Sequence, residues 1–362
     1  MIAFFLIFLL LFIIWAEKKL YGRLWKRGLT AEINFEKCEV FEGETNHLKI
    51  QVANRKSLPL NVLNVKFNTH KSLKFKNEEN LSTSDMNNKQ DMFSVRGYEK
   101  ITRNLEVKCS KRGIFTVDEI DLVSRDYLMF KDYVEQKEVF TKLTVYPKAI
   151  NPARINNALK QINGEIATER FSFDNSFDIK NIREYTPADP IKSINHTASA
   201  KSEDFMVNVF ENTTDVKVTV LLNLENYTGI DETALKEESI RISAGVCESF
   251  IKQGIPTGFC TNGISTVTGK HVFVKQGCGD NHISSIRHSL SEIDENKTLF
   301  KGVQLKDFCD SNFCVIISQN VNREFISAFA DFNKAYFIVP YDINGEKPEV
   351  PFKNIFLWEV QP

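Results

Sequence analysis

The chain has 362 residues, of which 42% are hydrophobic and 26% charged, and its formal net charge is -1. This composition is typical of a globular protein, and the length favours two compact domains plus an appendage over a single core. The near-neutral charge argues against nucleic acid as a partner, because binding to phosphates needs a basic face.

An apolar stretch opens the chain, since residues 1–16 carry no charged side chain. As a helix this stretch spans about 24 Å, against roughly 30 Å of hydrocarbon in a bilayer. Interfacial Trp15, Tyr21 and Trp25, together with snorkelling lysines, cover most of the difference. We therefore expect a membrane anchor helix over residues 1–16, with the lipid bilayer as a partner.

Basic residues after this helix predict its orientation by the positive-inside rule, which places the body of a single-pass cell-membrane protein in the cytoplasm. These residues are Lys18, Lys19, Arg23, Lys26 and Arg27. A cleaved secretory signal is the main alternative, but no basic region precedes the apolar run and no small-x-small cleavage site follows it. A buried helix of a soluble protein is the other alternative.

Residues 28–147 show short stretches of period two, such as Leu48, Ile50 and Val52 alternating with polar neighbours. Turn residues separate these stretches and no long helical run intervenes, which predicts a β-sandwich domain of immunoglobulin-like type. The polar, Asn-rich stretch from Leu73 to Phe93 is expected to be a surface loop. Gly113 is expected to adopt a positive φ at a turn into a strand.

Residues 148–214 form a connecting segment that contains the most ordered motif of the chain. Asp189 followed by Pro190 predicts a helix start, because the carboxylate can cap free backbone donors and proline suits the first helical position. Ile191, Ile194 and Ala198 then fall on one helical face. The pattern predicts a helix from Pro190 to about Lys201.

This motif resembles a family catalogued as "domain of unknown function 58", whose members share an Arg-x-Tyr-x-x-Gly-Asp turn, an Ile-x-Trp step, a Ser-Ala pair and a strand ending in Phe-Glu. The matching residues are Arg183, Tyr185, Asp189, Lys192, Ile194, Ser199, Ala200, Val207, Phe210 and Glu211. The resemblance extends to residues 111–113, 124–130 and 145–147, and so covers most of the chain. Ala188 and His196 depart from the family's glycine and tryptophan, and a single apolar helix stands in place of the usual pair.

Two roles are open for the polar residues of the motif. Arg183, Asp189 and Glu211 are suited to a charge-paired bracket between a helix and the following strand, and Tyr185 adds a ring and a hydroxyl. Such a network could clamp two domains, or the same residues could form a docking surface. No nucleophile and base stand at a telling spacing, so we expect no catalytic residue.

Residues 215–362 alternate between strand and helix patterns. The stretch from Val216 to Leu224 is nearly all apolar, which is typical of a strand covered on both faces. Helices are expected near 233–253, 283–293 and 323–334, with strands between them, which predicts a doubly wound α/β domain. The family resemblance identifies this domain as von Willebrand factor A-like.

Domains of that type usually carry a metal site that opens with Asp-x-Ser-x-Ser, because carboxylate and hydroxyl groups supply hard oxygen ligands to magnesium. The aligned positions here are Asn223, Glu225 and Tyr227. Ser318, Gln319 and Asn320 stand where another acidic residue is expected. Too few ligands remain, so we expect a degenerate site, with no metal and no cofactor.

Two further patterns suggest sites that we do not expect. Residues 263–271 look like a phosphate-binding loop, but five residues separate the glycines and no Ser or Thr follows Lys270, so a hairpin turn is the better interpretation. The seven cysteines include no Cys-x-x-Cys pair and favour reduced thiols in a cytosolic compartment. Cys309 and Cys314 lie five residues apart without a complementary zinc ligand, and we expect both to be thiols.

The resemblance implies a functional setting, because members of that family commonly accompany MoxR-type AAA+ ATPases and transglutaminase-like membrane proteins, so we expect an AAA+ ATPase and other membrane proteins as partners. We therefore expect a membrane-anchored, cytoplasmic, non-enzymatic interaction or scaffold protein that acts with such an ATPase in complex assembly or remodelling. The alternative is a metal-dependent adhesion or ligand-binding A-domain protein. An enzyme is less favoured, because the chain contains no G-x-S-x-G, HExxH or intact phosphate-loop motif.

Overall fold

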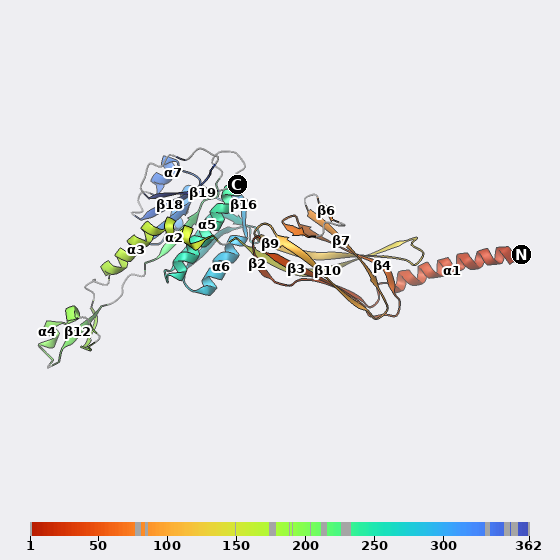
Figure 1. Ribbon diagram of the computed structural model, residues 1–362, viewed down its shortest axis with the longest axis horizontal. Coiled ribbons are helices and arrows are strands. Elements are labelled where there is room, and N and C mark those ends of the chain that lie inside the picture. Colours follow the sequence, from red (N-terminus) through yellow and green to blue (C-terminus); the bar gives the residue numbers. More distant parts are fainter. Residues whose placement is uncertain are drawn as a thin grey trace. The chain divides into compact units, whose positions relative to one another are not determined.

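The computed structural model forms two compact units, Met1–Lys148 and Ala149–Pro362 (Figure 1). It describes all residues except 1, 77–80, 84–85, 149, 174–178, 188, 190, 203, 211–215, 226–232, 330–333, 344–347, 349–353 and 361–362. Each unit contains its own hydrophobic core.

Helix α1 (Ile2–Leu24) opens the first unit. Its carboxyl end packs on the sandwich that follows, where Tyr21 is 2% exposed. The Tyr21 hydroxyl lies 2.7 Å from Ser124 Oγ, and the Tyr133 hydroxyl donates to the Lys18 carbonyl at 3.0 Å. The amino-terminal part of α1 instead leaves its large apolar side chains exposed, from Phe4 to Ile13.

The prediction of a membrane anchor helix is wrong, and with it the prediction of a single-pass cell-membrane protein with a cytoplasmic body. Among the described residues, no helix has both the length and the apolar character that a bilayer span requires. The apolar run stops at Ala16, and the remaining turns of α1 carry Glu17, Lys18, Lys19 and Arg23. These charges leave the apolar part shorter than the roughly 20 residues of a typical span.

A β-sandwich was predicted after this helix, and the first unit contains one. The first sheet has the order β1-β3-β8-β5 and the second has the order β2-β10-β9-β4-β7-β6. All neighbours are antiparallel except β2 and β10. The strands are β1 (Leu29–Phe35), β2 (Glu39–Phe41), β3 (Thr45–Asn54), β4 (Leu60–His70), β5 (Leu73–Phe75), β6 (Leu81–Thr83), β7 (Met86–Val95), β8 (Lys100–Cys109), β9 (Gly113–Arg125) and β10 (Asp132–Tyr146).

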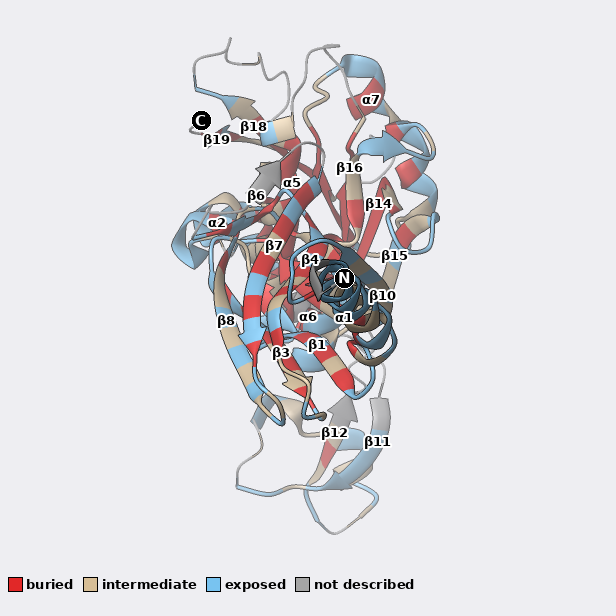
Figure 2. Cartoon of the chain, turned by 90° about the vertical axis from the view of Figure 1, so that its right-hand side faces the viewer, coloured by how far each residue is buried: buried red, intermediate tan, exposed pale blue. Residues whose placement is uncertain are grey.

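The sandwich core follows from the period of two in its strands. Leu48, Ile50 and Val52 on β3 are fully buried, and the polar residues between them, exposed Lys49 and half-buried Gln51, lie on the opposite face. The same alternation of buried and exposed residues runs along β7 (Figure 2). Gly113 has φ 151° at the start of β9, as predicted for this turn.

The prediction of a surface loop over residues 73–93 is wrong, because β5, β6 and β7 lie there. The pattern misled because β7 buries polar side chains, Asn87, Lys89 and Asp91 among them, while Met92 is exposed. Asn87 Nδ2 donates to the Leu73 carbonyl at 2.9 Å, and Asp91 pairs with Arg103 at 3.2 Å. These partners allow polar groups to occupy the inward face of a strand.

The second unit is built on a mixed sheet of order β15-β14-β13-β17-β18-β19, with β16 also paired to β14. Its strands are β13 (Val218–Leu222), β14 (Thr257–Ser265), β15 (His271–Gly277), β16 (Ile293–Thr298), β17 (Phe313–Ile317), β18 (Ala335–Asp342) and β19 (Ile355–Val360). The helices beside this sheet are α2 (Pro152–Ala158), α3 (Lys160–Phe173), α5 (Thr233–Lys252), α6 (Asp280–Ser291), the 3-10 helix η2 (Gly302–Phe308) and α7 (Arg323–Ala328). Alternate residues of the central strands enter two separate hydrophobic clusters, one on each face of the sheet.

The prediction of a doubly wound, von Willebrand factor A-like α/β domain is wrong. The sheet is not wound throughout by helical crossovers, because β14 turns directly into β15 and is antiparallel to both β15 and β16. Strand residues also outnumber helical ones over the described chain. An apolar run identifies a buried strand, but the direction of its neighbours depends on how distant segments pack. The hairpin turn predicted for residues 263–271 is confirmed, with Ile264 opposite His271.

Two features near the sheet differ from the sequence-based expectations. The first part of the predicted connecting segment forms α2 and α3, and Ile155 of α2, Ile162 of α3 and Leu159 between them are buried in the core of the second unit. Cys309 and Cys314 form a disulfide with their Cα atoms 6.5 Å apart, so the prediction that both are thiols is wrong.

Candidate functional site

The family-like motif folds into a small two-stranded sheet, β11 (Ile179–Glu184) antiparallel to β12 (Met206–Phe210). Between these strands lie the 3-10 helix η1 (Ile191–Ser193) and helix α4 (His196–Ser199). We call residues 179–210 the hairpin segment. Figure 1 labels α4 and β12 within it.

The single helix predicted from Pro190 to Lys201 is wrong, because the segment is interrupted at Ile194. That residue forms an antiparallel bridge with Val207, which takes its backbone out of the helical pattern. Asn195, rather than Asp189, then caps the helix α4: its Oδ1 accepts from Ala198 N at 2.9 Å. Pro190 and Ala188 lie outside the described residues.

Arg183 and Asp189 form a two-pronged ion pair inside the hairpin segment. The two guanidinium nitrogens of Arg183 donate to the two carboxylate oxygens of Asp189 at 2.6 and 2.8 Å. Thr186 adds two donors to the same carboxylate, its backbone N–H at 2.9 Å and its hydroxyl at 2.7 Å. The Arg183 guanidinium first, and then Thr186, hold the pKa of Asp189 well below its ordinary value.

This ion pair joins β11 to the turn that follows it. The Arg183 side chain is half-exposed, so the pair is not the buried clamp between two domains that was one of the two roles considered. The third member of the expected bracket, Glu211, lies outside the described residues. The charged groups of Arg183 and Asp189 are thus hydrogen-bonded to each other and to nearby backbone groups.

The remaining motif residues also support the local backbone. Ser199 Oγ donates to the Asn195 carbonyl and accepts from Met206 N, each at 2.8 Å, and thereby ties α4 to β12. Tyr185 N donates to the Phe205 carbonyl at 2.8 Å. Lys192 and Ala200 are exposed on η1 and at the end of α4, and Phe210 closes β12.

The hairpin segment leaves a strand edge and large apolar side chains accessible. In the part of the chain that the structure describes, β11 pairs with β12 alone. Ile182, Ile191 and Phe205 are 43%, 77% and 65% exposed. An unpaired strand edge offers a row of backbone donors and acceptors to another chain. This property is the strongest functional feature of the motif.

The predicted degenerate metal positions lie at the carboxyl end of β13, in a buried amide network. Asn223 Oδ1 accepts from Asn262 Nδ2 at 2.8 Å and from Glu225 N at 3.1 Å, and Asn223 Nδ2 donates to Ser318 Oγ at 3.0 Å. Asn262 Oδ1 accepts from Leu224 N at 2.9 Å. The oxygens of both amides are thus already engaged by protein donors.

Glu225 is held in the same way, since its Oε2 accepts from Gly302 N at 3.0 Å. A side chain at position 302 would clash with the network, because a Cβ there would lie 2.5 Å from Asn223 Nδ2. Tyr227 lies outside the described residues. The described side chains include no cluster of three or more His, Cys, Asp or Glu residues able to hold a metal ion. This geometry gives no support to the metal-dependent alternative.

The buried cysteines Cys109 and Cys260 are unsuited to act as nucleophiles. Burial raises the pKa of Cys109 to about 11 and the pKa of Cys260 to about 12. Thiols with such values are protonated and inert at neutral pH, because the thiolate is the reactive form.

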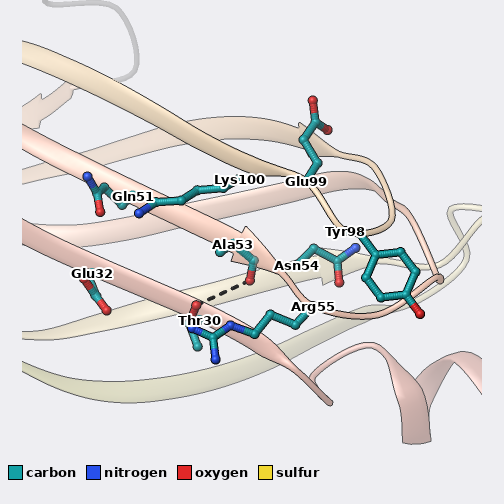
Figure 3. A pocket seen from close by; sticks show the side chains of 9 residues that line it. All are labelled: Thr30, Glu32, Gln51, Ala53, Asn54, Arg55, Tyr98, Glu99 and Lys100. Atoms are coloured by element: carbon teal, nitrogen blue, oxygen red, sulfur yellow. Dashed lines mark hydrogen bonds between the residues drawn. The ribbon is translucent and has the colours of Figure 1, made fainter.

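A surface depression of about 310 Å³ lies on the outer face of the first sheet of the sandwich (Figure 3). Ala53 forms part of its floor, and Arg55 and Lys100 extend along the sheet on either side of it. Tyr98 stands at one end and Glu32 at the other. No pattern in the sequence indicates this depression, because its residues come from two turns and three strands and form no linear motif.

No family model matches the sequence, and no curated protein matches it either. Among solved structures, a non-cellulosomal cohesin from Archaeoglobus fulgidus is 7% identical and covers 32% of this chain and 91% of its own, with a TM-score of 0.22. The CARDB domain of a Pyrococcus furiosus protein is 9% identical, with coverages of 32% and 93% and a TM-score of 0.22. A cohesin in a cohesin–dockerin complex from Clostridium thermocellum is 13% identical, with coverages of 32% and 99% and a TM-score of 0.20. Likenesses this weak carry no functional argument.

Proposed function

We propose that the protein is a non-enzymatic interaction or scaffold protein, and that its hairpin segment binds a partner protein. The open edge of β11 carries this proposal. An extended segment of a partner can add a strand there, with main-chain hydrogen bonds supplying affinity and neighbouring side chains supplying specificity. Ile182 on β11 is an exposed apolar contact for such a strand.

The internal bonding of the hairpin segment supports binding rather than chemistry. Arg183 and Asp189 neutralise each other, and Ser199 is engaged as both donor and acceptor. These bonds hold the backbone around β11 before any partner arrives, and pre-organisation reduces the entropy cost of binding.

We propose a MoxR-type AAA+ ATPase as the partner, in the assembly or remodelling of a complex. This choice rests on the resemblance of residues 183–211 to the "domain of unknown function 58" family, whose members commonly accompany such ATPases. The conformation of an AAA+ protein changes with its nucleotide, so binding is expected to differ between nucleotide states.

The test is direct binding of the purified chain to the MoxR-type ATPase of the same organism, measured by biolayer interferometry with ATP, ADP or a slowly hydrolysed analogue. Ile182→Lys places a charge beside the open edge and is expected to weaken binding at least tenfold, because an unpaired charge is costly in an interface. Val267→Lys is the matched control, since Val267 is an exposed apolar residue elsewhere in the second unit.

Two results would contradict the proposal. One is no binding of the unmodified chain in any nucleotide state, which removes the ATPase as partner. The other is equal binding by the Ile182→Lys and Val267→Lys variants, which removes β11 as the contact. Circular dichroism of both variants establishes that neither substitution unfolds the protein.

A further inference from the structure

The turn between β7 and β8 holds Tyr98 in a conformation that side chains other than glycine rarely adopt. Its φ is 58°, in the left-handed region, and its side chain is 76% exposed. Left-handed backbone costs roughly 1–2 kcal/mol for a residue with a Cβ. Because the ring is exposed, burial of the aromatic side chain does not offset this cost.

The neighbouring backbone explains how the turn is held. Tyr98 N donates to the Lys56 carbonyl at 3.1 Å. Gly97 packs so closely on the adjacent turn that a Cβ there would lie 2.5 Å from the Ser57 carbonyl oxygen. Position 98 thus receives its backbone shape from two packed turns, while its side chain is free to serve another purpose. Strained residues of this kind cluster at binding sites.

Tyr98 forms one end of the depression on the sandwich face, next to two cations. Arg55 and Lys100 are exposed, and neither forms an ion pair with a carboxylate of the described residues. Glu99 is nearby, but its Oε2 accepts from Arg96 N at 2.6 Å, and its side chain points away from the depression in Figure 3. Glu32, at the end opposite Tyr98, is the remaining acidic group of the lining.

We propose that this depression binds a short extended peptide segment with an aromatic, an acidic and a basic residue at alternate positions, because alternate side chains of an extended chain point to the same side. The aromatic ring lies against Tyr98, the carboxylate lies between Arg55 and Lys100, and the basic group meets Glu32. A volume of about 310 Å³ is near the lower end of ligand-binding pockets, which suits a few side chains of a peptide. The site is in the first unit and is independent of the partner proposed for the hairpin segment.

The negative charge of Glu32 disfavours a ligand with several phosphates. The second negative group of such a ligand would approach Glu32, and like charges repel each other at short range. A single carboxylate uses the two cations fully, because hydrogen bonds from guanidinium and ammonium groups to a carboxylate are among the strongest available to a protein.

The test uses the full chain and a fluorescent Gly-Phe-Ser-Asp-Ser-Lys-Gly peptide with blocked ends, monitored by anisotropy, in which the three recognised side chains stand at alternate positions. Saturable binding is expected, and replacing Asp by Asn in the peptide is expected to weaken it at least tenfold, because a charge-assisted contact is lost. Arg55→Gln and Lys100→Gln are each expected to have a similar effect. Lys49→Gln is the matched control, because Lys49 is an exposed lysine of β3 outside the depression.

The Glu32→Gln variant tests whether the basic end of the peptide lies against Glu32. This substitution is expected to weaken binding of the Lys-containing peptide severalfold, because an attractive charge is removed. It is expected to strengthen binding of a peptide with Glu in place of Lys, because a repulsive charge is removed. Affinity changes of the same sign for both peptides would overturn the assigned orientation.

The Tyr98→Asn variant distinguishes a loss of peptide affinity from a loss of stability. Asparagine tolerates the left-handed region, so the thermal midpoint is expected to be no lower than that of the unmodified chain, while peptide affinity falls. Unchanged affinity in this variant, equal binding of the Asp and Asn peptides, or equally strong binding of inorganic phosphate would each overturn the proposal.

Discussion

Lys56 shows how a single side chain can oppose the fold that contains it. Its ammonium nitrogen is buried and has no hydrogen-bond acceptor among the described residues. Burial first, and then the nearby charge of Lys137, lower the pKa of Lys56 from 10.5 to about 8. The folded state therefore disfavours the charged form.

A pH dependence follows from this shift. Between pH 8 and 10.5 the unfolded chain retains a proton that the folded chain has lost, so the contribution of Lys56 to stability rises with pH across this window. Lys56→Met is expected to raise the free energy of unfolding near pH 7 by about 1 kcal/mol, because partial exposure screens much of the penalty. Urea denaturation at pH 7 and pH 10.5 measures this gain, which should shrink at the higher pH. An equal gain from Lys49→Met would show that the effect is not specific to burial.

Asn262 illustrates the opposite case, a buried polar group with its partners in place. It is fully buried, donates to Asn223 and accepts from Leu224 N. Asn262→Ala is expected to destabilise the second unit by about 2–3 kcal/mol, because two buried groups lose their partner. Chemical denaturation measures this change, with exposed Asn157→Ala as the control. A loss below about 0.5 kcal/mol, the usual range for surface changes, would contradict the assigned network.

At the scale of elements, α3 contributes to the core despite a sequence of mixed polarity. Its Ile162 and Ile166 enter the larger cluster of the second unit, together with Ile155 of α2 and Leu159 between the two helices. The spacing of these four residues, three or four apart, is typical of an amphipathic helical stretch and is visible in the sequence, although the stretch is divided into two helices at Leu159. The helix is held further by Glu165 and Glu169, which contact Tyr336 and Lys334.

Ile162→Ala tests whether α3 is an integral part of this unit. Ile162 is fully buried, and removing its side chain is expected to cost about 2–5 kcal/mol through lost burial and a residual cavity. Gln161→Ala on the exposed face of the same helix is expected to change stability little. Similar denaturation midpoints for the two variants would show that α3 does not stabilise the unit.

At the scale of the whole molecule, the chain carries separate cores in its two units. The sandwich cluster uses residues between Tyr21 and Val145, and the two clusters of the second unit use residues from Ile155 onward. Each unit is also long enough to bury a core of its own. Because each unit contains its own core, we expect the two units to fold independently of each other.

Chains of residues 1–148 and 149–362, produced independently, are each expected to unfold cooperatively. Thermal circular dichroism in the near and far ultraviolet measures this behaviour. A fragment that lacks a cooperative transition, or lacks near-ultraviolet signals, would show that its unit depends on the other.

The sequence by itself determined the sandwich strands, the long helix near residues 233–252 and the turn between β14 and β15. Those elements follow from local periodicity and turn residues, which a single segment carries alone. The tertiary structure decided the antiparallel edge of the second sheet, the strands between Leu73 and Phe93, the interrupted helix after Asp189 and the depression beside Tyr98. These features depend on partners distant in the chain. Asn87 donates a hydrogen bond to the Leu73 carbonyl, Ile194 forms a bridge with Val207, and Tyr98 N donates to the Lys56 carbonyl. Local patterns do not identify such partners, because a buried polar group is tolerated only where the fold brings another group to it.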